Sequence, residues 1–593
     1  MPDDLHGVRS RHVRLPGLTR AAVFLIAVYG AGCSRSSTAA LSIEAGAPSN
    51  AATTPSAVGV AVALPGTPAT VVLRGYARDG AAASHRLVDA CGERAAYLAI
   101  RRSATASLGV WRAWLKIAGE AAFGSQIAIQ ETGGSISALD RAMQAHDCSA
   151  QRDAAMNLEG AFRVTQDVLG RNDLPPKAAG QALSDAAYQL GQAILESTSF
   201  VPEGDDAAAA DVAGFVDFLE AGTAAMELRV DEAIAPLARL RDVKRLAEVT
   251  GRGALVRATG VLGRAIRLAL RDRGLETTLQ NRPLRDAPEP SALTLPRPTA
   301  PTNAAQAELG RRLFEDVRLS PDRSRACVTC HVPSRAFSDG LAAPSSRDPS
   351  VALRRNTPSL LYAPLQAALT WDGRVRTADA QALMVIHTTA EMGLSDADIV
   401  GLVGSDPTYA AQFRSAFGLA PTTGDVGLAL AAYEASALVP GKARIDRLAR
   451  GELATLAPDE SAGLDVFAGK GRCARCHVPP VFGGSRPPDF TAPVFAVLGV
   501  PDRPGGSVVD SDRGRNGAFR VPTVRNVGRT APYFHHGRYP TLEEVVDFYD
   551  RGGGRGLGLD VPNQDPEIRP LHLTPDERRT LLVFMRDTLD DTR

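Results

Sequence analysis

The sequence predicts an all-α protein, in which an N-terminal helical bundle is followed by two related helical modules. The first observation is an apolar period within residues 69–286, where Leu183, Ala187, Leu190 and Ile194 follow at intervals of four, three and four. This spacing places apolar side chains on one helix face, and such helices in one block favour an antiparallel bundle. The second observation is a cysteine and histidine motif that occurs twice in the second half of the chain. At 593 residues the chain exceeds one hydrophobic core, so several domains are expected.

The first 33 residues have the pattern of a signal peptide. Four arginines precede the apolar run AAVFLIAVYG, which suits a secretory leader better than a membrane span. We therefore expect export to the periplasm. The run ends near Cys33 in a sequence that resembles a lipoprotein cleavage box, so two readings stay open: a lipidated Cys33 that tethers the protein to a membrane, and a cysteine in a discarded leader. Residues 34–68 are rich in Ala, Ser, Thr and Pro and predict a flexible tether.

Overall charge and the cysteines of the helical block narrow the function only slightly. Lysine plus arginine (66) equals aspartate plus glutamate (66), so no overall basic field favours a nucleic-acid partner. Cys91 and Cys148 lie in the helical block. Such a pair can form a disulfide in an oxidising compartment or remain as two separate buried thiols, and the sequence leaves both readings open. The block contains no cysteine-histidine cluster, so its role stays open.

A proline-rich linker at residues 287–303 separates the helical block from two modules, residues 304–452 and 453–593. LGRRLFEDVRLS leads into the first copy of the motif and AGLDVFAGKG into the second, and Val-Pro follows both copies. The copies are 146 residues apart, from Cys327 to Cys473. We therefore expect two structurally related domains.

Both copies have the form Cys-x-x-Cys-His, which is the attachment signature of haem c. The two thiols bond to the porphyrin, and the histidine becomes an iron ligand. Zinc is the alternative, but a zinc site needs a second pair of ligands, and neither module has one at a suitable distance. Two covalent haem c groups in two cytochrome c-like domains are therefore predicted. The residues are Cys327, Cys330 and His331 in the first module and Cys473, Cys476 and His477 in the second.

An iron with protein ligands on both faces transfers electrons, whereas an iron with one open face can bind peroxide. The function therefore depends on the outer face of each iron. In the first module, the stretch between His331 and Asn356 contains no histidine, methionine or tyrosine, so we expect an open face. Further along the chain, the polar candidates for this face are Trp371, Gln381, His387 and Glu391.

Glu391 and Gln381 suit the chemistry of an open haem. A carboxylate can take a proton from peroxide and return it to the leaving oxygen, and an amide can hold the oxygen in place. The alternative for Glu391 is a helix cap or a surface ion pair, and His387 has the same two readings.

In the second module, PTLEEVVDFYDRGGG predicts one short helix that begins with a capping box and ends at glycines. Tyr549 shares the buried face of this helix and therefore points inward. Met585 lies among leucine and phenylalanine, where a core methionine is expected. The further candidates for an outer ligand are His535, His536 and His572.

Residues from about 304 to 593 resemble the bacterial dihaem cytochrome c peroxidases and their MauG-like relatives. The resemblance rests on LGRRLFEDVRLS, CVTCHVPSRAFSDG, RNTPSLLY, WDGR, EMG, CARCHVPP, VPTVRNVGRTAPYFHHG and TLEEVVDFY, in the order of the family. It implies that Glu391 is the acid and base of the peroxide reaction, with Gln381 ten residues before it, and that Trp371 lies between the two haem groups as an electron conduit. It also implies a calcium site at Asn356 and the carbonyls of Thr530 and Pro532, although Asn356 also suits a plain turn.

Two departures from the peroxidase pattern point to the MauG-like branch. Peroxidases of this family carry a histidine in the loop before RNTP that blocks the reactive haem, and this chain has none. They also carry methionine where this chain has Tyr549, whereas MauG-like members have tyrosine. An oxygen ligand stabilises the higher iron states.

Three functions follow from these residues. The first is reduction of hydrogen peroxide with electrons from a small redox protein, a cytochrome c or a cupredoxin. The second is oxidation of side chains in a partner protein by means of peroxide. The third is electron transfer without turnover, which requires an outer ligand on the first haem.

Overall fold

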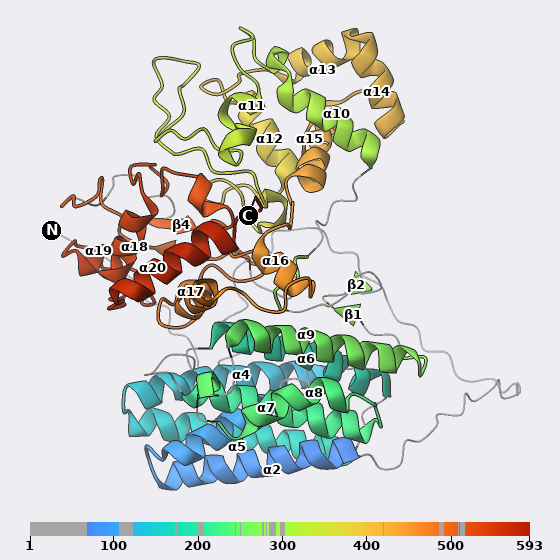
Figure 1. Cartoon of the computed structure of the whole chain (residues 1–593), viewed down its shortest axis with the longest axis vertical. Helices are drawn as coiled ribbons and strands as arrows, with labels where there is room; N and C mark the ends of the chain where they lie inside the picture. Colours follow the sequence, from blue (N-terminus) through green and yellow to red (C-terminus); the bar gives the residue numbers. More distant parts are fainter. Residues whose placement is uncertain are drawn as a thin grey trace, which may run out of the picture. The chain divides into compact units, whose positions relative to one another are not determined.

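The computed structural model describes most of the chain beyond residue 67, and helices dominate it (Figure 1). The all-α prediction is confirmed. Within the described residues the strands form two small sheets, β1 (Thr278–Leu279) with β2 (Arg282–Pro283), and β3 (Phe495–Val497) with β4 (Ala518–Arg520). The predicted leader, Cys33, the tether up to residue 67 and most of the linker lie outside the described residues. The structure describes residues 68–105, 123–171, 176–197, 206–243, 245–248, 251–275, 278–279, 282–283, 292–296, 303–418, 420–485, 491–507, 509 and 516–592.

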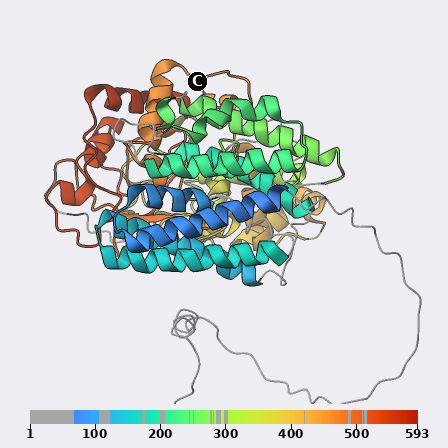
Figure 2. The same cartoon turned by 90° about the horizontal axis from the view of Figure 1, so that it is seen from below.

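The long helices of the N-terminal block lie side by side (Figure 1, Figure 2). α5 packs against α2 and α4, and α6 packs against α7 and α9. The short helix α8 rests on α9. The helices are α2 (Pro68–Asp89), α4 (Phe123–Gln144), α5 (Cys148–Arg171), α6 (Pro176–Glu196), α7 (Asp206–Ala225), α8 (Asp231–Ala238) and α9 (Arg252–Arg271).

The apolar face predicted for residues 183–194 is the buried face of α6. Leu183, Ala187, Leu190 and Ile194 are each at most 1% exposed and belong to a large hydrophobic core. Apolar side chains at this period leave water together, which is the main driving force for packing these helices.

Cys91 and Cys148 form a disulfide, with their Cα atoms 5.4 Å apart. The bond joins the turn after α2 to the first residue of α5. Of the two alternatives that the sequence left open, the disulfide is therefore the one observed.

The C-terminal half contains two groups of helices (Figure 1). The first group is α10 (Ala304–Glu315), α11 (Cys327–Cys330), α12 (Ala378–His387), α13 (Asp396–Ser405), α14 (Pro407–Phe417) and α15 (Thr423–Ala437). The second is α16 (Arg444–Ala449), α17 (Pro458–Ala468), α18 (Leu542–Asp550), α19 (Gly553–Gly556) and α20 (Pro575–Val583), which continues as a π-helical turn, Phe584–Thr588. The first motif begins in α11, and the second begins between α17 and α18 in sequence, at Cys473–Arg475.

Each group contains an equivalent pair of crossing helices. In the first group α10 packs on α15, and in the second α17 packs on α20. At each crossing a glycine faces the backbone of the other helix. An added Cβ at Gly310 would lie 2.9 Å from the Cβ of Tyr433, and one at Gly463 would lie 2.6 Å from the Cβ of Phe584. Both distances are well below normal carbon contact, so a side chain at either glycine would force the helices apart.

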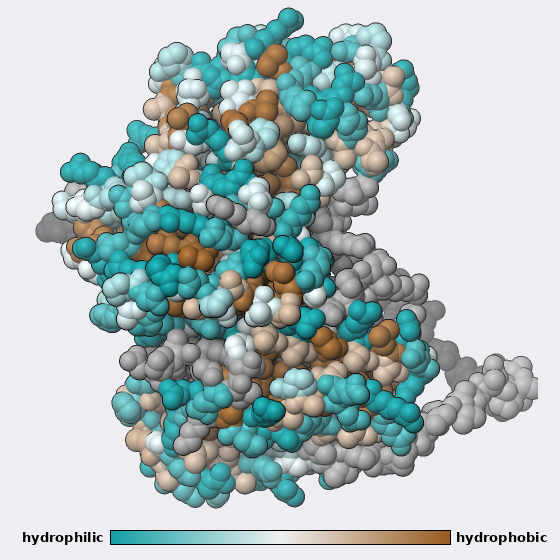
Figure 3. All heavy atoms as spheres, in the orientation of Figure 1, coloured by the Kyte–Doolittle hydropathy of each residue, from teal (hydrophilic) through white to brown (hydrophobic). Residues whose placement is uncertain are grey.

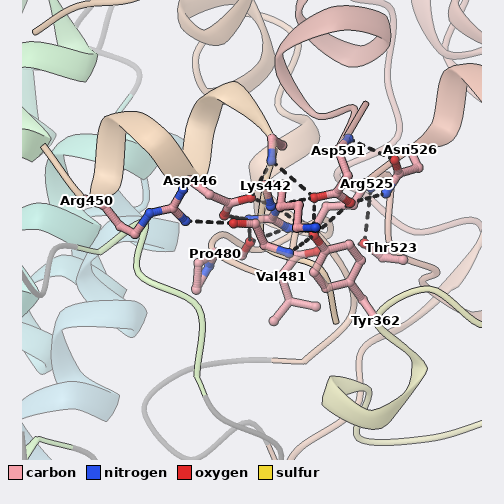
Figure 4. A network of polar contacts seen from close by, with 12 residues as sticks. Tyr362, Lys442, Asp446, Arg450, Pro480, Val481, Thr523, Arg525, Asn526 and Asp591 are labelled. Atoms are coloured by element: carbon pink, nitrogen blue, oxygen red, sulfur yellow. Dashed lines mark hydrogen bonds and ion pairs between the residues drawn. The ribbon is translucent and has the colours of Figure 1, made fainter. Parts of the chain in front are cut away.

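A buried polar network joins the two groups of helices (Figure 4). Arg525, which is 1% exposed, pairs with Asp446 at 2.8 Å and donates to the carbonyl of Pro480 at 2.7 Å. The carboxylate of Asp591 accepts from the hydroxyl of Tyr362 at 2.9 Å and from the amide of Asn526 at 2.6 Å. Segments from both modules and the C-terminal end are thereby fixed to one another.

A second buried arginine links the N-terminal helices to α17. Arg252, at the start of α9, is fully buried and donates to the carbonyls of Ile194, Leu195 and Ser197 at 2.8 to 2.9 Å. These carbonyls belong to the end of α6, where backbone acceptors have no partner inside the helix. Arg252 also pairs with Asp465 of α17 at 3.2 Å.

Hydrophilic residues cover most of the face shown in Figure 3, with small hydrophobic areas between them. The large exposed apolar side chains are scattered along the described chain, from Met156 to Leu428. No helix among the described residues has the length and apolar character needed to cross a membrane.

Candidate functional site

The first Cys-x-x-Cys-His motif forms a tight turn that presents its histidine to a cavity. The backbone N–H of His331 donates to the carbonyl of Cys327 at 2.9 Å. Nδ1 of His331 lies 3.0 Å from the carbonyl oxygen of Phe337, which can only accept, so Nδ1 carries the proton and Nε2 is left as a lone-pair donor. Desolvation lowers the pKa of His331, which keeps the ring neutral as a metal ligand requires.

The second motif repeats this geometry. The N–H of His477 donates to the carbonyl of Cys473 at 2.8 Å, and its Nδ1 lies 2.9 Å from the carbonyl oxygen of Pro522. Desolvation lowers the pKa of His477 to about 4. A hydrogen bond to the far nitrogen is the usual means by which proteins orient a ligating histidine.

The side chains at each motif are those that a covalently attached haem c requires. The four cysteines are free thiols, and each pair lines a large cavity together with its histidine. Arginines that line the first cavity supply charges of the sign that haem propionates need. They are Arg325, Arg355, Arg374 and Arg520.

The first cavity brings together Gln381, Glu391 and Trp371 with the first motif, as the resemblance implied. Gln381 lies in the first turn of α12, and Glu391 follows the end of that helix. Desolvation raises the pKa of Glu391, while Arg374 opposes the shift. A carboxyl group with a raised pKa is suited to both accepting and returning a proton.

His387 is not part of this cavity. Its Nδ1 lies 2.8 Å from the carbonyl oxygen of Leu394, and its Nε2 pairs with Asp396 at 3.3 Å. Of the two roles that the sequence left open for His387, a structural role and a role at the haem, the structural role is therefore the one observed.

Two methionines that the sequence analysis missed line the first cavity, Met384 and Met392. Met392 is 3% exposed and belongs to the hydrophobic core, whereas Met384 lies one helical turn after Gln381. Among the described residues, the lining contains one histidine, His331, and no tyrosine.

Tyr549 lines the second cavity with Cys473, Cys476 and His477. It lies on α18, and the predicted capping box is confirmed, since Thr541 accepts from the N–H of Glu544 at 3.3 Å. Desolvation, followed by the charges of Cys476 and Cys473, raises the pKa of the Tyr549 hydroxyl. Tyr549 therefore lies in the same cavity as the second motif, close enough for the charges of both cysteines to act on its hydroxyl.

Met585 also lines this cavity, and at 6% exposure it belongs to the hydrophobic core as well.

Trp371 lines both cavities, so it lies where a conduit between them would be needed. Its indole N–H donates to the carbonyl of Asn356 at 2.8 Å, which fixes the ring. The ring centroid of His535 lies 6.5 Å away, and His535 itself stacks on Phe519 at 3.8 Å. Because Trp371 lies far in the sequence from Phe519 and His535, no local pattern could have predicted this aromatic cluster.

Asn356, Thr530 and Pro532 line the second cavity together. Nδ2 of Asn356 donates to the carbonyl of Leu341 at 2.7 Å, which leaves Oδ1 as an acceptor. Within the described residues there is no cluster of three or more His, Cys, Asp or Glu side chains able to hold a metal. A cation at Asn356 would therefore depend on amide and backbone oxygens.

Known proteins resemble the half of the chain that carries these cavities. A family model for di-haem cytochrome c peroxidase matches residues 304–454. The methylamine utilization protein MauG of Methylorubrum extorquens is 35% identical over 295 residues, which cover 49% of this chain and 80% of that protein. The cytochrome c551 peroxidase of Nitrosomonas europaea is 33% identical over 254 residues, covering 42% and 74%. Among solved structures, a MauG-like protein associated with microbial copper homeostasis is 29% identical in sequence to this chain. The match covers 50% of this chain and 93% of that protein, with a TM-score of 0.44. The chain belongs to the family of dihaem cytochrome c peroxidases and MauG proteins.

Proposed function

We propose that this protein reduces hydrogen peroxide in the first cavity, with electrons from a small redox protein. The chain is a haem c oxidoreductase of the peroxidase type, as its relatives show. The observation that carries the proposal is that Glu391 and Gln381 share one cavity with Cys327, Cys330 and His331. Electron transfer without turnover is set aside, because the relatives are peroxidases and MauG proteins.

Glu391 takes a proton from hydrogen peroxide and returns it to the oxygen that leaves as water. Its raised pKa supports both steps, because a weaker acid gives up its proton less readily and holds it until the leaving oxygen needs it. Gln381 orients the peroxide by hydrogen bonding. The haem, when bound at His331, supplies the iron that passes electrons to peroxide. Two electrons and two protons convert one peroxide into two waters.

We propose that Trp371 carries electrons from the second site to the first. It lines both cavities, and its hydrogen bond to Asn356 holds the ring in place. In the second site His477 and Tyr549 are the proposed iron ligands, because both line one cavity with Cys473 and Cys476.

Tyr549 also favours a second candidate function, peroxide-driven oxidation of side chains in a partner protein. A tyrosine oxygen stabilises ferric and higher iron states, which suits storage of oxidising equivalents better than acceptance of electrons from a cytochrome. The MauG of Methylorubrum extorquens is a methylamine utilization protein, and it is among the relatives of this chain.

The location, the donor and the calcium ion are further parts of the proposal. The arginine-rich apolar leader supports export to the periplasm, and a lipidated Cys33 would tether the protein there. A cytochrome c or a cupredoxin is the proposed donor. Calcium is proposed at Asn356, Thr530 and Pro532, because these residues line one cavity and offer oxygen ligands.

Rapid mixing of the fully ferric, haem-loaded protein with one equivalent of peroxide tests the proposal. An immediate absorption change at the first haem is expected if its outer face is open. The Met384→Leu variant serves as the control, because Met384 is the less buried of the two thioethers in that cavity. A ferric wild type that is inert, beside a Met384→Leu variant that reacts, would show that Met384 blocks the iron. If a protein substrate is used, the oxidised state formed by peroxide outlasts added cytochrome c and decays when the partner protein is added.

A further inference from the structure

The first cavity contains a buried carboxyl group that the peroxide chemistry does not use. Glu434 lies on α15, is 4% exposed, and lines the cavity together with Cys327 and His331. Burial, and after it the charge of Glu434, raises the pKa of the Cys327 thiol to about 12. Glu434 is therefore near the cysteine by which the haem attaches.

The two helix crossings identify the equivalent position in the second module. Glu434 follows Tyr433, whose Cβ faces Gly310, and Met585 follows Phe584, whose Cβ faces Gly463. Each residue lines the cavity of its own module. The carboxyl group of Glu434 in the first site thus occupies the position of the Met585 thioether in the second site. Met585 shows that an apolar side chain can pack at this position. The carboxyl group costs burial free energy and is not required by the fold.

Glu434 has no hydrogen bond or ion pair from its side chain within the described part of the chain, although arginines line the same cavity. Glu391 is the other carboxyl group in the lining. The charged side chains on the helices packed against α15 pair mainly with one another. They are Glu308, Arg311, Arg312 and Glu315 on α10, where Arg311 pairs with both glutamates, then Asp379 and His387 on α12, and Asp396 and Asp398 on α13, where Asp396 pairs with His387.

Burial raises the pKa of Glu434 to about 8, because its carboxylate is not compensated by a neighbouring charge. The group is therefore mainly protonated at neutral pH. A positive charge that develops in the cavity would reverse this preference, since opposite charges at low dielectric attract strongly.

We propose that Glu434 releases a proton to solvent when the haem attached at Cys327 and Cys330 loses an electron, and takes one back when that haem is reduced. One electron and one proton leave together, so the net charge of the cavity stays constant. The carboxylate offsets the charge of the oxidised haem and makes its oxidation easier as pH rises. Met585 cannot do this, so the second haem lacks the same coupling.

Spectroelectrochemical titration of the haem-loaded full chain between pH 6 and pH 9 tests the inference. In the wild type, the equilibrium constant for oxidation of one haem should change by up to about tenfold per pH unit, which is 59 mV for a one-electron couple. In Glu434→Gln, that haem should keep only the weaker pH dependence of its own propionates. The matched control is Met585→Leu, which alters the equivalent position of the second module and should leave the pH dependence of the first haem unchanged.

A second readout follows the proton itself. Infrared difference spectra on oxidation should show loss of a protonated-carboxyl band in the wild type and in Met585→Leu, and no such band in Glu434→Gln. Glu434→Met, which copies the residue of the second site, should behave as Glu434→Gln, so the test does not depend on one variant folding. Equal pH dependence in the wild type and both Glu434 variants would overturn the inference. The inference about Glu434 requires that haem attaches at Cys327 and Cys330, and it does not require turnover. A protein without peroxidase activity would therefore not contradict it.

Discussion

Asp446 of α16 and Arg525 form a bidentate ion pair at 2.8 and 2.9 Å, with side chains 3% and 0% exposed (Figure 4). A buried pair contributes little net stability relative to apolar residues, but removal of one partner leaves a charge without compensation. The pair therefore holds Arg525 in place, and the guanidinium of Arg525 lies 4.8 Å over the ring of Tyr362 from the first module.

Asp446→Asn should lower the free energy of unfolding by about 3 kcal/mol or more, because Arg525 would stay buried without its counter-charge. Urea unfolding followed by helical circular dichroism and by haem absorption measures the change. The control is Asp459→Asn, which breaks the exposed pair between Asp459 and Arg579 and should leave the free energy of unfolding almost unchanged, because solvent screens this pair. Equal effects of the two substitutions would show that Arg525 does not depend on Asp446 for its counter-charge.

Glu391→Gln should slow the reaction of the ferric protein with peroxide by about 10²- to 10⁴-fold, the usual contribution of a general acid and base. Stopped-flow absorption measures this rate. His387→Gln is the matched control, four residues before Glu391, because His387 binds Leu394 and Asp396 outside the cavity. A similar loss in both variants would mean that the segment as a whole was disturbed.

The same rate should rise with pH through the pKa of Glu391. A proton acceptor must be ionised, and desolvation raises the pKa of Glu391 above its ordinary value, so the midpoint should lie at a higher pH than for an exposed glutamate. The rate should level off at higher pH and fall as pH drops through the midpoint. Rates measured from acid to neutral pH in the wild type test this, and a flat profile would remove Glu391 from the proton transfer.

What the sequence could predict here depended on local patterns. Tyr549 was expected to point inward because a capping box and an apolar period define its helix, and both are local in sequence. Glu391 and Gln381 required the family resemblance, since a carboxylate near a helix end has several ordinary roles. The structure then separated them from His387, which the sequence could not do.

Glu434 shows why the other residues of the site could not be predicted from the sequence. Its sequence neighbourhood, AAYEASAL, is that of a helix with one charged residue. Its importance depends on the crossing of α10 and α15 at Gly310, and on the same crossing at Gly463 in the other module. Contacts between segments more than a hundred residues apart, such as Arg525 with Tyr362, likewise leave no periodic trace.

The disulfide between Cys91 and Cys148 should stabilise the N-terminal helices by about 4 kcal/mol, because it closes a loop of 57 residues and restricts the unfolded chain. The double substitution Cys91→Ser and Cys148→Ser should lower the midpoint of thermal unfolding of these helices. Addition of reductant should reproduce the loss in the wild type and have no further effect on the variant. An unchanged midpoint in both experiments would contradict this role.

Tyr549→Met should raise the reduction potential of the second haem, because a thioether favours ferrous iron and a tyrosine oxygen favours ferric iron. A rise on the order of 0.1 V is expected, within the range of about 0.8 V that axial ligands span. Redox titration followed by absorption measures it. Met585→Leu is the control, since Met585 lines the same cavity but belongs to the hydrophobic core. If Met585→Leu shifts the potential and Tyr549→Met does not, Met585 is the outer ligand, and the main argument for oxidation of a partner protein is lost.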